Sequence, residues 1–427
     1  MALSGRKTYL QTARDGGRRT LNEQTNRRST FRLAYISTLL DGYNLTVSAP
    51  LIVLLSRFMN LTLIDTALLA SSALIGNAIG GFLLGRLSDL FGRRTLLIVD
   101  LLLYAAMGLL SSLSVTIIEI VIFRVLLGIG IGGDYPNSSS LLTETQGNSG
   151  RGKPVGFLGT SWSIGFGLAL LSGLLLYPLG PDAWRVLLFL PVIPSITVVI
   201  LRSRLDESRA WKSRREQARG ENVRRIFSRE LRTFTIYAAT FWFLFDAIQY
   251  GISEYAPTVM KLIGVHGNTT GIIASLVLAA VEVIGTLIGI SLVDREGRRN
   301  VQIIGFLGIS ISMLIAAFVT QEYILIAVLF ALGAFVGFAP GILEFIYPPE
   351  MFPTELRGTG AGFANSVSRI GAVVGVLVQP FILSLSNGLT YLFLMYFGMA
   401  FAVLMITIAI APETTSKSVI LEIAEVQ

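Results

Sequence analysis

The stretch GRLSDLFGRR at residues 85–94 returns in altered form as VDREGRR at residues 293–299. The aspartates of the two stretches, Asp89 and Asp294, are 205 residues apart. Three more pairs keep the same register to within one residue: Asp41 with Asp246, Asn77 with Glu282, and Arg151 with Arg357. One such match means little, whereas four in one register indicate an internal duplication. The sequence therefore predicts two homologous halves.

The chain around these loops is mostly apolar. Hydrophobic residues make up 52% of the 427 residues and charged residues only 14%. In a typical soluble protein, about a quarter of the residues are charged. A helix needs about 20 apolar residues to cross a bilayer. Twelve runs meet that length: 31–56, 66–87, 95–113, 117–141, 154–178, 184–201, 233–260, 270–293, 301–319, 323–347, 359–385 and 388–411. We expect an all-α membrane protein with twelve transmembrane helices in two pseudo-symmetric six-helix bundles.

Composition also divides the chain into five segments. We expect a basic N-terminal segment, an N-terminal bundle, a basic linker, a C-terminal bundle and a tail, at residues 1–30, 31–201, 202–232, 233–411 and 412–427. The first thirty residues are polar and basic, without the apolar region of a cleavable signal peptide.

The net charge of +7 has a topological explanation. Most of the 34 lysines and arginines fall in the N-terminal segment, the linker and the loops on the same side of the predicted bundle. Cytoplasmic loops of membrane proteins carry such an excess. We therefore expect both termini and the linker to be cytoplasmic, in a plasma-membrane protein, and we expect no binding to nucleic acid.

Few side chains of the usual catalytic types are present. The chain has no cysteine and one histidine, His266, which excludes disulfides, thiolate metal sites and a cysteine nucleophile. No nucleophile–base set or cofactor-binding loop is visible. We expect no enzyme activity, no metal and no cofactor. The expected partners are a small molecule, protons and the lipid bilayer, with a monomer as the working unit.

The glycine of each repeated loop permits a tight turn between two spans. Charges in the same loops suggest a gate. An aspartate close to an Arg-Arg pair can form ion pairs at the ends of helices, and several pairs that form and break together would latch one conformation. The alternative is that these are simple helix-end charges. The predicted gating residues are Asp89, Arg93, Arg94, Arg124, Glu144, Arg151, Asp294, Arg298, Arg299, Glu350 and Arg357.

Several acids lie inside the predicted spans. A charge at the bilayer centre costs roughly 2.5–3.5 kcal/mol on insertion scales, which makes each one a functional candidate. With one histidine, proton coupling falls to carboxylates, and the candidates are Asp41, Asp134, Asp246 and Glu282. Asp134 is ten residues from Arg124, about 15 Å along a helix, so we expect it to meet Asp41 instead. The alternative for Asp41 and Asp246 is a hydrogen bond that holds helices together.

The duplicated loops and the twelve spans resemble those of the major facilitator superfamily over residues 31–418. That resemblance implies a secondary transporter whose site lies between the two halves.

Two branches of that superfamily compete. GGDYP at residues 132–136 and the segment 242–251 resemble the phosphate:proton symporters. This resemblance implies that Asp41 and Asp134 pass the proton, and that Arg369 takes the place of a lysine of that branch. The predicted substrate-binding residues are Tyr135, Trp162, Trp242, Asp246, Tyr250, Glu344 and Arg369. Phosphate or a related small anion is the expected cargo.

Other motifs resemble the sugar porters: EYAP at residues 254–257, DESR at residues 206–209 and PET at residues 412–414. The glutamines and the tryptophan that bind sugar in that branch are missing. A proton-coupled porter of sugars, carboxylates or organic ions is therefore the alternative. A non-transporting membrane sensor on the same scaffold is a more remote one.

Overall fold

A computed structural model of the chain describes residue 29 and residues 31–91, 93–145, 152–203, 223–267, 269–353 and 356–414. Its regular structure over these residues is helical. In the N-terminal half, a helix over residues 31–46 continues into α2. The later elements of this half are α2 (Ser48–Leu55), α3 (Leu63–Phe91), α4 (Arg93–Leu113), α5 (Ile117–Thr145), α6 (Gly152–Leu176), η1 (Tyr177–Leu179), α7 (Ala183–Phe189) and α8 (Val192–Arg202).

The C-terminal half repeats this arrangement after the short η2 (Val223–Phe227). Its helices are α10 (Arg232–Ile263), α11 (Thr270–Glu296), α12 (Arg298–Phe318), α13 (Glu322–Phe338), α14 (Pro340–Met351), α15 (Arg357–Leu383) and α16 (Gly388–Ile410). Prolines divide two of the crossings, α7 from α8 at Pro191 and α13 from α14 at Pro340, because proline removes a helical hydrogen bond.

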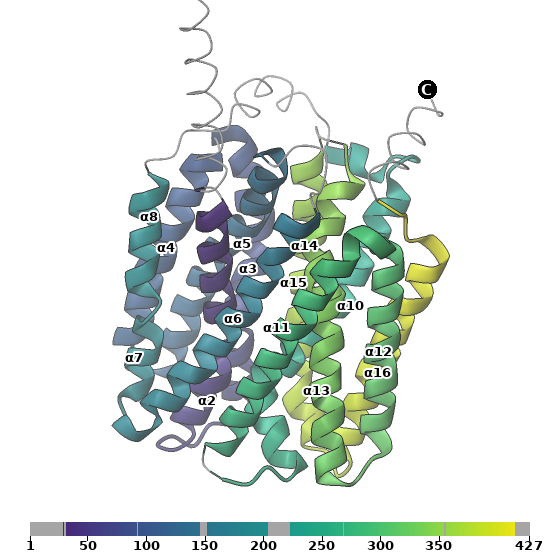
Figure 1. Cartoon of the computed structure of the whole chain (residues 1–427). Helices are drawn as coiled ribbons and strands as arrows, with labels where there is room; N and C mark the ends of the chain where they lie inside the picture. Colours follow the sequence, from purple (N-terminus) through teal and green to yellow (C-terminus); the bar gives the residue numbers. More distant parts are fainter. Residues whose placement is uncertain are drawn as a thin grey trace, which may run out of the picture.

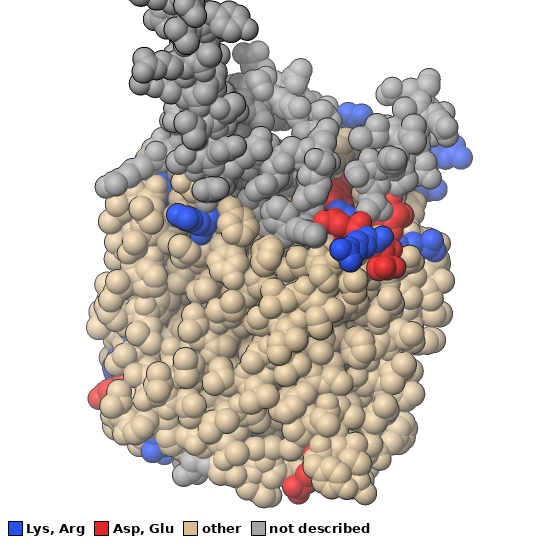
Figure 2. Space-filling view, viewed as in Figure 1, with Lys and Arg blue, Asp and Glu red and all other residues tan. Residues whose placement is uncertain are grey.

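The described helices cross the molecule twelve times, as the sequence predicts, and Figure 1 shows them as one upright bundle. Ten helical segments are apolar and long enough to span a membrane. The other two crossings are α5 and α10. Helix α10 turns Asp246, Gln249 and Glu254 into the protein interior, so its composition is polar although it lies inside the bundle. Figure 2 shows a wide belt without charged side chains between the two ends of this face.

Glycine contacts confirm the duplication. A side chain at Gly80 in α3 would collide with the carbonyl oxygen of Ile129 in α5. A side chain at Gly285 in α11 would collide in the same way with Ala334 in α13, and both residues of this contact stand 205 positions further along. Such backbone contact needs glycine, because a Cβ would force the helices apart. The two halves therefore share helix packing as well as sequence.

Another glycine lies at a sharp turn of the chain. Gly297 lies between α11 and α12 with φ +86°, a conformation that residues with a Cβ rarely adopt. This is the glycine of the repeated loop motif, and its expected tight turn between two spans is confirmed.

The two halves meet along a few helix pairs. Helix α3 packs on α15, and α6 packs on α11 and α14. We call the end of the bundle where α8 ends and α10 begins the terminal face, which is the upper end in Figure 1. The space between the halves, midway between the terminal face and the opposite face, holds the candidate site.

Candidate functional site

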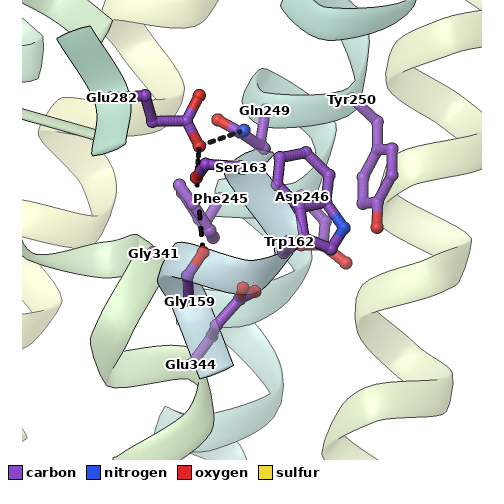
Figure 3. A pocket seen from close by; sticks show the side chains of 10 residues that line it. All are labelled: Gly159, Trp162, Ser163, Phe245, Asp246, Gln249, Tyr250, Glu282, Gly341 and Glu344. Atoms are coloured by element: carbon purple, nitrogen blue, oxygen red, sulfur yellow. Dashed lines mark hydrogen bonds between the residues drawn. The ribbon is translucent and has the colours of Figure 1, made fainter. Parts of the chain in front are cut away.

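A small pocket opens between α6 of the N-terminal half and three helices of the C-terminal half, α10, α11 and α14. Figure 3 shows its side chains converging from both halves. The lining residues are Gly159, Trp162, Ser163, Phe245, Asp246, Gln249, Tyr250, Glu282, Gly341 and Glu344. Because its walls come from both halves, any relative movement of the halves changes this pocket.

The Glu282 carboxylate anchors one side of the pocket. Ser163 Oγ donates a hydrogen bond to Glu282 Oε1 at 2.8 Å, and Gln249 Nε2 donates to the same oxygen at 3.3 Å. The first bond links the two halves, since Ser163 lies on α6 and Glu282 on α11. Neither Ser163 nor Gln249 is among the predicted site residues, because isolated serines and glutamines carry no recognisable motif.

Asp246 and Arg369 form an ion pair beside the pocket. Arg369 Nη1 on α15 lies 3.1 Å from Asp246 Oδ2 on α10, with both side chains buried. The same nitrogen donates a hydrogen bond to the Tyr250 hydroxyl at 2.6 Å. Arg369 is thus held by two residues of the pocket wall. A buried charge needs such partners, because burying it alone would cost several kcal/mol.

Aromatic side chains surround the remaining carboxylate. Trp242 Nε1 donates a hydrogen bond to Glu344 Oε2 at 2.9 Å, so Trp242 supports the pocket from behind Glu344. Trp162 and Tyr250 meet edge to face, with ring centroids 5.7 Å apart. The pocket therefore combines aromatic walls with three acidic groups and one nearby guanidinium. The side chain of Tyr135, the other predicted binding residue, lies outside the described part of the structure.

The predicted proton-coupling residues divide between the halves. Asp246 and Glu282 line the pocket, whereas Asp41 and Asp134 are buried inside the N-terminal half. Asp41 Oδ1 accepts a hydrogen bond from the Tyr104 hydroxyl at 3.3 Å.

Asp134 lies near Asp41 and also has an arginine partner that the sequence did not predict. Asp134 forms a buried ion pair with Arg202, whose Nη1 and Nη2 lie 3.1 and 3.2 Å from Asp134 Oδ1. Asp41 lies near enough to Asp134 to interact electrostatically. Arg202 is the last residue of α8 and was assigned to the linker from sequence, because the apolar run stops at residue 201.

Arg124 does not lie with the other predicted gating residues. It is buried near the start of α5, towards the opposite face. Its guanidinium donates hydrogen bonds to Ser72 Oγ, to the carbonyl oxygen of Asn44 and to Ser48 Oγ, at 3.2, 3.1 and 2.7 Å. These contacts join α5 to the first and second spans of the N-terminal half, and Arg124 also interacts electrostatically with Glu254 on α10 of the C-terminal half.

At the terminal face, Arg298 is the centre of a charged cluster. It forms ion pairs with Asp294 at 2.9 Å and with Glu350 at 3.1 Å. Glu413 accepts hydrogen bonds from the backbone N–H groups of Arg298 and Arg299 at 3.0 and 3.2 Å. Figure 2 shows charged side chains gathered at this rim.

The cluster at Arg298 joins helices of the C-terminal half to one another. Its members lie on α11, α12, α14 and the segment after α16. The Thr414 hydroxyl donates a hydrogen bond to Glu350 Oε2 at 2.6 Å. Glu413 and Thr414 belong to the PET motif at residues 412–414 but are not among the predicted site residues. Arg151 lies outside the described residues, as do the side chains of Asp89, Arg93, Arg94, Glu144 and Arg357. Among the described residues, no group of acidic and histidine side chains could hold a metal ion.

Comparison with known proteins agrees with this architecture. Two matches to the family model "Sugar (and other) transporter" cover residues 30–233 and 211–423. The inner membrane metabolite transport protein YgcS of Escherichia coli is 29% identical over 82% of this chain and 84% of that protein. The "Probable 4-methylmuconolactone transporter" of Cupriavidus pinatubonensis is 28% identical over 91% of both chains.

Solved structures show the same fold. The proton:xylose symporter XylE, with 6-bromo-6-deoxy-D-glucose bound, superposes with a TM-score of 0.78 over 92% of this chain and 98% of that one, at 23% identity. That protein belongs to the major facilitator superfamily. Two family matches on a duplicated twelve-helix bundle with a pocket between its halves lead to one conclusion: the chain belongs to the sugar (and other) transporter family, shares the fold of XylE and is a multi-pass membrane transporter rather than an enzyme.

Proposed function

We propose that the protein carries a small polar organic metabolite into the cell together with protons, by alternating access between its two halves. The single observation that carries this proposal is the pocket, in which hydrogen-bonding and aromatic groups from both halves converge. The expected substrate is neutral and rich in hydroxyl groups, or carries a single acid group. This is the sugar or organic acid alternative of the sequence analysis.

The charges around the pocket argue against phosphate. Asp246, Glu282 and Glu344 are set against one guanidinium, Arg369, which Asp246 already pairs. A phosphate dianion about 4 Å from one of the unpaired pocket carboxylates would meet a repulsion of about 8 kcal/mol at an effective dielectric constant of 20. One guanidinium can balance at most one acid group of a substrate. Trp162 and Tyr250 offer ring faces and edges to a carbon skeleton, which phosphate lacks.

The relatives support an organic cargo. The relative from Cupriavidus is named for a lactone of an organic acid, YgcS is named for metabolites, and XylE is named for xylose and protons. None of these three names mentions phosphate. The resemblance to phosphate symporters rested on two motifs, in the fourth and seventh spans.

The Asp246–Arg369 pair gives coupling a concrete form. Protonation of the Asp246 carboxylate would end its ion pair and leave Arg369 available for a substrate oxygen. Binding of a substrate with an acid group would then favour a protonated Asp246, because the guanidinium cannot balance both. Glu282 and Glu344 are the further pocket acids that a hydroxyl-rich substrate can approach with its O–H groups.

The orientation is part of the proposal. The basic segments of the sequence place the terminal face, with both termini and the linker, in the cytoplasm of a plasma-membrane protein. The protein is proposed to work as a monomer, since the pocket is built from a single chain.

Uptake into proteoliposomes tests the function. The panel contains labelled pentoses, hexoses, aromatic or unsaturated monocarboxylates, dicarboxylates and phosphate, each measured with and without an acidic exterior. We expect accumulation of one neutral or monocarboxylate class, at least tenfold higher with the proton gradient. Accumulation of phosphate alone, or uptake that ignores the gradient, would contradict the proposal.

Variants of Arg369 then separate the two substrate classes. For an acidic substrate, Arg369→Gln abolishes binding, and Arg369→Lys keeps part of it by holding the charge without the fork of donors. For a hydroxyl-rich neutral substrate, the ratio between the two variants is close to one. The exposed variant Asp182→Asn is the control in both cases.

A further inference from the structure

Three carboxylates of the N-terminal half gather around one guanidinium, away from the substrate pocket. Asp134 on α5 pairs with Arg202 at the end of α8. Asp41 in the first span and Asp100 on α4 both interact electrostatically with that pair. All four side chains are at least nine-tenths buried. We call Asp41, Asp100, Asp134 and Arg202 the inner acid cluster.

Asp100 is the carboxylate of this cluster that is not among the predicted site residues. Only 2% of its surface is exposed, and neither carboxylate oxygen has a hydrogen-bond partner within the described residues. Its Oδ2 lies against the backbone of α5 at Gly133, where any Cβ would collide with it. The glycine thus makes room for this carboxyl next to Asp134. Burying an ionised carboxylate without a partner costs free energy, and a bound proton removes that cost.

The C-terminal half shows that helix packing does not require these charges. At the 205-residue offset, Asp100, Asp134 and Arg202 correspond to Gly305, Ala339 and Thr407. Gly305 faces Ala339 so closely that a Cβ on the glycine would meet the alanine Cβ. Thr407 forms a hydrogen bond of 3.2 Å with Tyr237. The same joint between helices is therefore built from small and neutral residues in one half and from charged ones in the other.

We propose that Asp100 is a proton-carrying residue of the transport cycle and that Arg202 positions the inner acid cluster for it. The proposal rests on the proton coupling proposed above. Three carboxylates against one guanidinium leave an excess of buried negative charge when all are ionised, which a bound proton removes. Asp134 already has Arg202 as an ion-pair partner through two short contacts, whereas Asp100 has none among the described residues, so we assign the proton to Asp100.

The cluster has a route of communication with the pocket. Among the described residues, the titratable and charged groups that act on Asp41 are Tyr104, Asp134, Arg202 and, from the other half, Arg369, and those that act on Asp100 are Asp134 and Arg202. Arg369 is also the partner of Asp246 at the pocket. A change in the charge of Asp246 therefore alters the field that Asp41 experiences. Asp100, on the second turn of α4 from the terminal face, lies towards the proposed cytoplasmic side, where the proton would leave.

Two transport modes separate proton coupling from folding. Counterflow exchange of labelled for unlabelled substrate needs a folded protein but no net proton movement, whereas accumulation driven by a pH gradient needs both. For Asp100→Asn, we expect gradient-driven accumulation to fall at least tenfold while exchange stays within about twofold of the wild type. Asp100→Glu, which restores a carboxyl, should restore part of the accumulation.

Arg202 is tested by the pH profile. Arg202→Gln releases Asp134 and should move the pH dependence of gradient-driven uptake by about one unit, with Arg202→Lys closer to the wild type. Ser111→Ala removes another buried, unpartnered polar group from α4 and is the matched control, for which neither mode should change.

The outcomes are distinct. If the wild type accumulates substrate with the gradient and Asp100→Asn does so equally well, this proposal is wrong and the proposed function stands. If Asp100→Asn loses exchange as fully as accumulation and Asp100→Glu restores neither, Asp100 has a structural role and the proposal is again wrong. If the wild type ignores the gradient, the proposed function fails and this proposal fails with it.

Discussion

Asp41 and Asp246 occupy the same position of the two halves, 205 residues apart, yet their surroundings differ. Asp246 lines the pocket between the halves, with a guanidinium 3.1 Å away. Asp41 is also buried, but it accepts a hydrogen bond from the Tyr104 hydroxyl at 3.3 Å. The arginine of its cluster, Arg202, forms its ion pair with Asp134 instead. One inherited position thus serves the pocket in one half and a separate acid cluster in the other.

This difference shows which parts of a duplicated scaffold are free to change. Glycine contacts between helices recur at the same offset in both halves, because any side chain there would force the helices apart. Buried charges recur only in part, because each depends on partners that arrive from other helices. Replacing Asp41 and Asp246 one at a time shows whether the two aspartates have separate roles.

The largest effect is expected for Asp246→Asn. The substitution leaves Arg369 buried without its ion-pair partner, and breaking such a pair typically costs about 3–5 kcal/mol. We expect substrate uptake to fall at least a hundredfold in both exchange and gradient-driven modes, with a lower unfolding temperature in detergent.

The double variant Asp246→Asn/Arg369→Gln provides the control. It removes both charges, so it should regain most of the lost thermal stability but not the uptake. Normal uptake by the single variant would show that Asp246 has no role at the pocket.

A smaller and more selective effect is expected for Asp41→Asn. An asparagine can still accept the hydrogen bond of Tyr104, so the free energy of unfolding should change by less than about 1 kcal/mol. Gradient-driven accumulation should fall at least tenfold, while exchange is kept. Equal loss of both modes would mean that Asp41 and Asp246 share one task after all.

Matched glycine variants test the helix contacts that recur in both halves. Gly80→Ala and Gly285→Ala each place a Cβ against the backbone of a neighbouring helix. Overpacking of this kind typically costs about 1–3 kcal/mol, and we expect similar losses of thermal stability for the two variants. A large loss at one site and none at the other would contradict the structural equivalence of the halves.

The smallest effect is expected for Asp182→Asn. Asp182 pairs with Arg185 at 3.2 Å on the opposite face, where it is 82% exposed. Such pairs contribute roughly 0–1 kcal/mol, so unfolding and transport should match the wild type. A measurable loss of transport would point to a role of this face that the comparison of the halves does not include.

The fold could be predicted closely because its determinants are local. Each span is an apolar run of the required length, and the described helices begin and end within a few residues of the predicted runs. The duplication followed from residue spacing alone, and the glycine contacts confirm it. The turn at Gly297 was predicted because a glycine between two spans permits a tight turn.

The site was predictable only in part, because its partners come from distant segments. Asp246, Glu282 and Glu344 were found as charges within apolar runs, and all three line the pocket. Arg202 was missed because its partner lies 68 residues away in sequence. The preference for phosphate rested on two motifs, whereas the family model and the named relatives favour the sugar or organic acid alternative.

The glycine contacts also have a mechanical consequence. Within each half, they press backbone on backbone, as between Gly80 and Ile129 or between Gly371 in α15 and Phe243 in α10. Between the halves, Gly81 in α3 faces the side chains of Asn365 and Ser366, and Gly156 in α6 faces that of Ile290, whereas Gly159 in α6 lies against the carbonyl oxygen of Gly341 in α14. Side chains can rotate and yield, whereas touching backbones cannot. A rocking movement of the halves can therefore use side-chain rotations at Gly81 and Gly156, but not at the backbone contact between Gly159 and Gly341.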